Sequence, residues 1–114
     1  MGHAHDVVEE LRLPSQQLRA AIPDVIGAYV SMQRAVMVDG ALAAKTKELI
    51  ALAISVTKQC DGCIGAHARG AARRGATEAE VCEAIGVAIL LNGGPGTVWG
   101  PRALAAYQEY ATTP

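Results

Sequence analysis

Aromatic side chains are scarce in this sequence. They make up 4% of its 114 residues, and phenylalanine is absent. β-Sandwiches and barrels favour aromatic and β-branched residues, so this scarcity argues against both architectures. An excess of one charge is also missing, because 10 Lys and Arg balance 11 Asp and Glu to give a net charge of −1. Without a broad basic surface, we expect no nucleic-acid partner.

Long apolar runs and an even set of cysteines are missing too. No run reaches the roughly 18 residues of a membrane-spanning helix, and the start, MGHAHDVVEE, lacks the apolar region of a signal peptide. The three cysteines are Cys60, Cys63 and Cys82. An odd number in a chain without a signal peptide argues against a disulfide framework and towards catalytic, redox or metal chemistry. We therefore expect a soluble, cytoplasmic protein with no membrane partner.

Alanine is abundant, with 22 copies. It has the highest helix propensity of all residues, and no segment shows convincing strand alternation. The sequence therefore predicts an all-α fold, a compact bundle of six to seven helices in a single domain over residues 1–114. Because alanine buries little area, the core of one subunit would be thin. We expect further burial against other subunits, and Ala- and Gly-rich faces at close helix crossings and subunit interfaces.

Local signals divide the chain into helices. Pro14 and Pro23 mark helix starts, Asp39-Gly40 a turn, and Gly75 a helix end. Thr77 and Glu80 have capping-box spacing, and residues 92–96 interrupt the pattern. The terminus that carries His3 and His5 is expected to be mobile and without function. The helices predicted cover about 4–13, 14–21, 23–38, 42–57, 61–74, 77–91 and 101–111, and a start one turn earlier is an alternative for the last.

The chemistry-bearing motif is Cys60-Asp61-Gly62-Cys63, at the start of a predicted helix. A helix N-terminus stabilises a thiolate, which favours Cys60 as the more acidic thiol. His67 follows Cys63 by four residues and Cys60 by seven, so all three share one helix face. An imidazole one turn from a thiol can accept its proton, which favours Cys63 as the nucleophile. The motif alone suits both redox dithiols and metal sites.

Glu48 lies near the start of the most apolar predicted helix. One interpretation is a solvated charge that pairs with Lys45 or Lys47, and composition alone favours it. The other is that the small-residue face carrying Ala51 and Ser55 packs on the cysteine helix. Glu48 would then be partly desolvated, which favours its protonated form and suits a proton carrier near neutral pH.

The spacing of Glu48, Cys60, Cys63 and His67 resembles the alkylhydroperoxidase D (AhpD)-like branch of the carboxymuconolactone decarboxylase family. The similarity covers about residues 45–91, including the run Gly-Ala-Thr-Glu-Ala-Glu-Val at 75–81. It implies a small all-helical fold that assembles as a homotrimer or homohexamer. It also implies a dithiol peroxidase or disulfide reductase that uses no haem, flavin or metal, and therefore no cofactor.

Residue by residue, the resemblance implies an antioxidant peroxidase site. Cys63 would attack a hydroperoxide, Cys60 would resolve the product as a disulfide, His67 would be the base and Glu48 the relay carboxylate. The reductant would be a thioredoxin-like or lipoyl-type protein. The family pattern has a histidine immediately before the second cysteine, where this chain has Gly62, so one proton-relay group is missing. Decarboxylation is not implied, because the decarboxylase branch lacks the cysteine pair.

Two alternatives stay open. Glu48, Cys60, Cys63 and His67 are in principle a Cys₂-His-Glu metal set, although the second C-x-x-C usual for structural zinc is missing. The chain is alternatively a non-enzymatic redox-sensing assembly subunit that uses the dithiol as a switch.

Other conspicuous residues are expected to be structural. Cys82 has the spacing of a buried apolar residue. The arginines at the end of the cysteine helix suit its C-terminal dipole and a solvated face, with an anionic-substrate role less favoured. The aromatic residues near the C-terminus would anchor the last helix or a subunit contact. These residues are Arg69, Arg73, Arg74, Trp99, Tyr107 and Tyr110.

Overall fold

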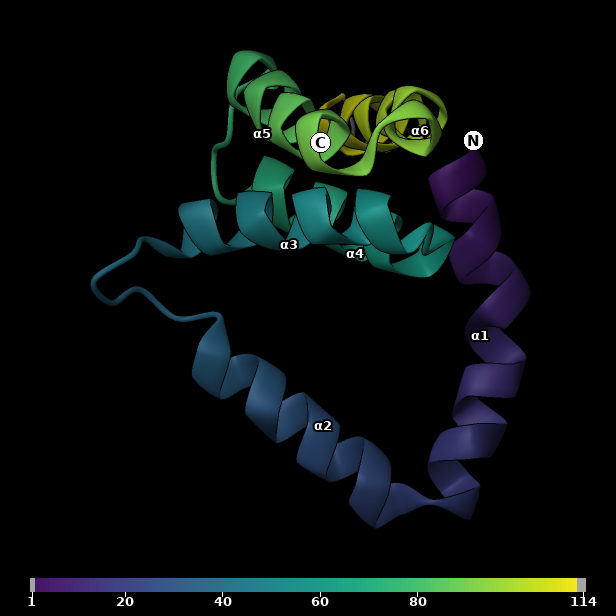
Figure 1. The fold of residues 1–114 in the computed structure, drawn as a ribbon. Helices are drawn as coiled ribbons and strands as arrows, with labels where there is room; N and C mark the ends of the chain where they lie inside the picture. The colour runs from purple at the N-terminus through teal and green to yellow at the C-terminus, as the bar shows by residue number, and fades with distance from the viewer. Residues whose placement is uncertain (1, 113–114) are drawn as a thin grey trace.

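A computed structural model describes residues 2–112, and these residues form six helices and no strand (Figure 1). The all-α prediction is confirmed, at the lower of the two helix numbers expected. The helices are α1 (His3–Ala21), α2 (Pro23–Val36), α3 (Ala44–Lys58), α4 (Asp61–Arg73), α5 (Glu78–Asn92) and α6 (Gly94–Ala111).

Four of the helices, α3 to α6, pack against one another as the body of the molecule (Figure 1). The beginning of the first helix, α1, contacts α4 and α6, and its far half projects away from the body (Figure 1). The second helix, α2, extends from the far end of α1 and has no buried residue. We call α1 and α2 together the arm. The cysteine motif lies at the start of α4, which is one of the helices of the body. The arm itself exposes many large apolar side chains.

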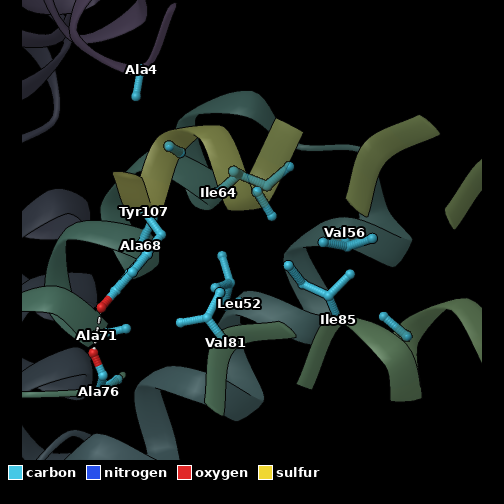
Figure 2. Close-up of a cluster of buried hydrophobic side chains, with 13 residues drawn as sticks. Ala4, Leu52, Val56, Ile64, Ala68, Ala71, Ala76, Val81, Ile85 and Tyr107 are labelled. Atoms are coloured by element: carbon cyan, nitrogen blue, oxygen red, sulfur yellow. Dashed lines mark hydrogen bonds between the residues drawn. The ribbon is translucent and has the colours of Figure 1, made fainter. Parts of the chain in front are cut away.

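The core contains few large side chains. Leu52, Val56 and Val81 are the largest that are fully buried, and Ile64 and Ile85 are nearly so (Figure 2). Most other buried positions are alanines, as the composition suggested. The buried alanines are Ala4, Ala44, Ala68, Ala71, Ala76, Ala88, Ala103 and Ala106.

Glycines allow α5 and α6 to pack closely. A Cβ atom at Gly96 would lie 3.0 Å from the Cα atom of Ile89, and one at Gly100 would lie 2.8 Å from Cγ2 of Ile85. Both positions are buried in α6. The expectation of small residues at close helix crossings is therefore confirmed at this one.

We expect Gly100→Ala to destabilise the fold by about 1–2 kcal/mol, because the methyl group overpacks the crossing and offsets the gain in helix propensity. Gly86→Ala in α5 is the matched control, since nothing lies within 4 Å of its Cβ position. It should raise stability by about 0.5–1 kcal/mol. Thermal unfolding at equal protein concentration would compare them. An unchanged midpoint for Gly100→Ala would contradict the close crossing.

The N-terminal predictions need correction. Pro14 does not end a helix, and residues 3–21 form α1 alone. Proline removes an N–H and crowds the carbonyl four residues earlier, here that of Glu10, but this part of α1 is exposed, so water can bind that carbonyl. The expectation of a mobile terminus is also wrong for His3 and His5, since both lie in this helix and His3 pairs with Asp61 at 3.1 Å.

The beginning of α1 is held by Glu109 of α6. Its carboxylate accepts hydrogen bonds from the Ala4 amide at 2.9 Å and the His5 amide at 3.3 Å, and lies 2.7 Å from His5 Nδ1. Burial raises the pKa of Glu109, but the hydrogen bonds from His5 and Ala4 together lower it by more. The pKa of Glu109 therefore lies below the usual carboxyl value. A carboxylate at this place satisfies amides that the helix itself leaves free.

Other boundaries follow from local capping. The third helix begins at Ala44 rather than residue 42, because the Asp39 carboxylate accepts the Ala44 amide at 2.7 Å. The predicted capping box of Thr77 and Glu80 is confirmed. The break after α5 is confined to Gly93, where φ is 69°, so α6 begins at Gly94 rather than near Pro101. No helix in residues 2–112 combines the length and apolar character needed to cross a bilayer.

Candidate active site

The cysteine pair lies at the N-terminus of α4. Cys60 is the N-cap residue, and it is joined to Cys63 by a disulfide whose Cα atoms are 5.2 Å apart. The Cys63 amide donates a hydrogen bond to Cys60 Sγ at 3.2 Å. Cys63 is exposed and Cys60 is half-buried. The fold therefore gives the pair an accessible sulfur and a second sulfur that receives a backbone N–H.

Glu48 and His67 form a pair behind the cysteines. Glu48 Oε2 lies 3.2 Å from His67 Nδ1, and thus joins α3 to α4. The Glu48 residue is 6% exposed, whereas the His67 side chain is 21% exposed. His67 is one turn from Cys63 along α4. An imidazole oriented by a buried carboxylate is a common arrangement for moving protons.

The solvated interpretation of Glu48 is wrong. Lys45 instead pairs with Glu80 at 3.1 Å, and the Lys47 ammonium donates to the backbone carbonyls of Val36 and Val38. The small-residue face predicted beside Glu48 is present. Ser55 is buried there and its hydroxyl donates to the Ala51 carbonyl at 2.7 Å. The carboxylate is therefore left to His67.

Gly70 is a site residue that the sequence reasoning missed. The Glu48 carboxylate lies so close to the Gly70 backbone that a Cβ atom there would overlap Cδ and both oxygens of Glu48. Only glycine permits this position of the carboxylate without displacing it. The spacing offered a signal, because Gly70 follows His67 by three residues on the same helix.

The structure does not connect His67 to a sulfur. In the described residues, 2–112, no hydrogen bond joins the imidazole to Cys60 or Cys63 in this disulfide form. Nor does this part of the chain contain a cluster of three or more His, Cys, Asp or Glu side chains placed to hold a metal ion. The Cys₂-His-Glu alternative therefore gains no support from the arrangement.

Other predicted residues have mixed outcomes. The burial predicted for Cys82 is wrong, because its side chain is exposed. Gly65, which is not one of the predicted site residues, lets α1 approach α4, since its Cβ position lies 3.7 Å from the Cβ atom of Ala4. Nothing lies within 4 Å of the Cβ position of Gly62, so the histidine that the family pattern has there is not excluded by space.

Tyr107 and Tyr110 attach α6 to other parts of the chain, as expected, and Trp99 packs against the core. The Tyr107 hydroxyl donates to the Ala76 carbonyl at 2.6 Å (Figure 2). The Tyr110 ring lies 4.6 Å from that of His5, and the Arg102 guanidinium lies 4.8 Å from the ring of Trp99. None of these contacts belongs to the cysteine site.

A large apolar groove lies elsewhere on the surface. It has a volume of about 580 Å³ between α3 and α5, and none of Glu48, Cys60, Cys63 and His67 lines it. We call it the α3–α5 groove. Its walls are Thr46, Leu49, Ile50, Ala53, Ile54 and Thr57 of α3 and Ala84, Val87, Ala88, Leu91 and Asn92 of α5.

These features define a class, the small all-helical proteins with a C-x-x-C pair at a helix N-terminus and a carboxylate–histidine pair behind it. The family model of the carboxymuconolactone decarboxylase family matches residues 23–109. This chain belongs to that family. The match extends well beyond residues 45–91, where the sequence resemblance was strongest.

Individual relatives agree with this assignment. A crystal structure of an apo carboxymuconolactone decarboxylase family protein from Legionella pneumophila is 35% identical, with a TM-score of 0.91 over 96% of this chain and 97% of that one. An uncharacterized protein from Haemophilus influenzae is 45% identical over 80% of each chain. "Uncharacterized protein 4 in cox locus" of Paracoccus denitrificans is 40% identical over 72% of this chain and 74% of its own.

Proposed function

We propose that this protein is an antioxidant thiol peroxidase, a dithiol–disulfide oxidoreductase that reduces hydroperoxides through Cys60 and Cys63. The observation that carries the proposal is the disulfide with an exposed Cys63 at the start of α4, together with the buried Glu48 carboxylate that pairs with His67, one turn further along the same helix. Family membership supports the general class, since AhpD-like proteins belong to this family.

The first step consumes the peroxide. The Cys63 thiolate attacks the distal oxygen of a hydroperoxide, the O–O bond breaks, and a proton goes to the departing alkoxide to give an alcohol. The sulfur becomes a sulfenic acid. His67, held by Glu48, supplies this proton after taking one from the Cys63 thiol.

The later steps restore the dithiol. The Cys60 thiol condenses with the sulfenic acid, which releases water and forms the Cys60–Cys63 disulfide. An external dithiol of the thioredoxin or lipoyl type then attacks this disulfide and is itself oxidised to a disulfide. A reducing compartment such as the cytoplasm supplies thiols of this kind, and we place the protein there.

Exposure and hydrogen bonding support different roles for the two sulfurs. Cys63 is the more accessible and lies one turn from His67, so it meets both the peroxide and the reductant. Cys60 Sγ accepts a hydrogen bond from the Cys63 amide, and this hydrogen bond would stabilise a thiolate at Cys60. A stabilised thiolate is a good leaving group, so reductant attack on Cys63 with departure of Cys60 is favoured.

The test is a thiol count and an intact mass, each before and after one equivalent of an organic hydroperoxide. The protein should carry Cys82→Ser, because the exposed third thiol would otherwise be counted. We expect the loss of both thiols and a mass decrease of about 2 Da, the two hydrogens lost on disulfide formation. Unchanged thiols would overturn the proposal. Oxidation without catalytic turnover would instead favour the redox-sensing subunit.

We also propose that further copies of this chain cover its exposed apolar surfaces. In α2, an apolar stripe with 4-3-4 spacing is formed by Val25, Tyr29, Met32 and Val36, each more than half exposed. A 14-residue helix without buried residues is marginal on its own, which supports the proposal that contacts outside the subunit stabilise it. In residues 2–112, Asn92 Nδ2, beside the α3–α5 groove, is the buried side-chain polar atom without a partner. A second copy can cover the apolar stripe of α2 and offer a hydrogen-bond acceptor to Asn92 Nδ2. The family resemblance implies a trimer or hexamer.

We expect light scattering to give a mass three or six times the 11.8 kDa of one chain. The double change Val25→Asp/Met32→Asp should lower that mass, since it places charges in an apolar interface. Ser31→Asp is the control, because Ser31 is exposed on a different face of α2. A stable monomer at micromolar concentration would show that the exposed stripe has another use.

A further inference from the structure

Positive side chains surround the space beyond Glu48. Arg69, Arg73 and Arg74 lie on α4 and its C-cap, and each is exposed. Within residues 2–112, none of the three has an acidic partner, unlike Arg12, which pairs with Glu9. A chain with a net charge of −1 thus concentrates three guanidinium groups beside its candidate active site.

These arginines line a cavity of about 470 Å³. A second cavity of about 370 Å³ shares Gln33, Glu48 and Arg74 with it and adds Arg34. We call the two together the arginine cavity. Its single carboxylate, Glu48, is paired with His67, so the remaining charge is positive. The residues that line the first cavity are Gln33, Glu48, Ala66, Arg69, Gly70, Arg73 and Arg74.

The helix dipole explains only some of this charge. Arg73 and Arg74 lie at the C-terminal end of α4, where cations are favourable. Arg69 lies in the middle of the helix, and Arg34 and Gln33 come from α2, so the dipole of α4 does not account for them. Groups from two helices therefore face one space, as expected for a site that binds an anion.

The cavity lies along the same face of α4 as the reactive sulfur. Ala66, Gly70 and Arg73 follow Cys63 by three, seven and ten residues, so small side chains separate the sulfur from the arginines. At a rise of about 1.5 Å per residue, Arg69 and Arg73 lie roughly 9 and 15 Å along the helix from Cys63. An extended chain advances about 1.2 Å per bond, so about eight to twelve bonds span this separation.

We infer that the arginine cavity binds the carboxylate of an acyl-chain hydroperoxide whose peroxide group reaches Cys63. This inference rests on the proposed peroxidase function and names its substrate class. The arginines hold the carboxylate by charge-assisted hydrogen bonds. The chain passes over Ala66, and the O–O bond of the peroxide breaks at Cys63 as in the first step of the proposed reaction.

The test compares linoleic acid hydroperoxide with its methyl ester, below the concentrations at which either forms micelles. We expect kcat/KM to be about ten-fold higher for the free acid, at the lower end of electrostatic effects on substrate encounter. Arg69→Gln/Arg73→Gln should bring the two substrates within about two-fold of each other, with the larger loss of rate for the free acid. Added salt should also reduce the preference of the wild type.

The control is Arg12→Gln/Arg102→Gln, which removes the same charge from α1 and α6. It should keep the preference for the free acid. Equal rates for acid and ester in the wild type, or a preference that survives in Arg69→Gln/Arg73→Gln, would overturn the inference. A change of oligomeric mass in that variant would also overturn it, since the arginines would then belong to a subunit contact.

A measurement without turnover separates this inference from the proposed function. Calorimetry of laurate binding to the wild type and to Arg69→Gln/Arg73→Gln needs no peroxide chemistry. Binding that is lost in the variant supports the carboxylate site even if no hydroperoxide is reduced. Turnover of both hydroperoxides without laurate binding would support the peroxidase and contradict the site.

Discussion

Cys63→Ser should abolish the reduction of organic hydroperoxides, with a loss of about 10³-fold or more in kcat/KM. The serine hydroxyl is close in size to the thiol but does not ionise near neutral pH, so the variant lacks the nucleophile and keeps the fold. The assay couples hydroperoxide reduction to oxidation of a dithiol. The Cys82→Ser protein is the background and should itself retain full activity, because Cys82 is exposed and lies outside the site.

Cys60→Ser should fail differently. Cys63 can still attack one equivalent of hydroperoxide, but no thiol remains to resolve the sulfenic acid. We expect a single turnover and a sulfenic acid that a dimedone reagent traps at residue 63. A sulfenic acid that dimedone traps at residue 60 in Cys63→Ser, together with no reaction of Cys60→Ser, would show that Cys60 attacks the peroxide. That outcome would agree with the backbone N–H that Cys60 receives, and the roles of the two sulfurs would be exchanged.

The helix pattern was predictable because the residues that start and end most of these helices act locally. Pro23, Gly75 and the Thr77–Glu80 capping box act through hydrogen bonds and backbone angles within a few residues, and each occurs where expected. The predictions were wrong where a contact with a distant residue or with solvent determines whether a helix continues. Pro14 is tolerated because α1 is exposed there, and the start of α1 is ordered because Glu109 reaches it from 104 residues away.

The site was predictable to the extent that spacing along one helix determines it. Cys63 and His67 lie in α4 and Cys60 is its N-cap residue, so their order along the chain nearly fixes their arrangement. Glu48 comes from another helix, and its burial depends on how α3 crosses α4. The sequence left its two interpretations open, and the close approach of Glu48 to Gly70 selects one. The arginine cavity depends on α2, whose placement no local signal describes.

Gly70→Ala should reduce turnover although it changes no reactive group. The added methyl group would occupy the place of the Glu48 carboxylate, which must then leave its position beside His67. General acid–base groups contribute about 10²–10⁴-fold to rate, so Glu48→Gln should cost about 10²-fold or more. We expect Gly70→Ala to cost about 10- to 100-fold, because a displaced carboxylate still reaches His67 in part of the population.

A lower rate alone would not distinguish positioning from damage to the fold. Gly86→Ala adds the same methyl group to α5 with nothing within 4 Å, and it should leave turnover unchanged. Glu48→Asp in the Gly70→Ala protein shortens the carboxylate by one methylene and makes room for the methyl group, so it should recover part of the lost rate. A merely structural glycine predicts no such recovery. If Gly70→Ala retains full activity, the Glu48–His67 contact is not needed for turnover, and His67 must act without its carboxylate.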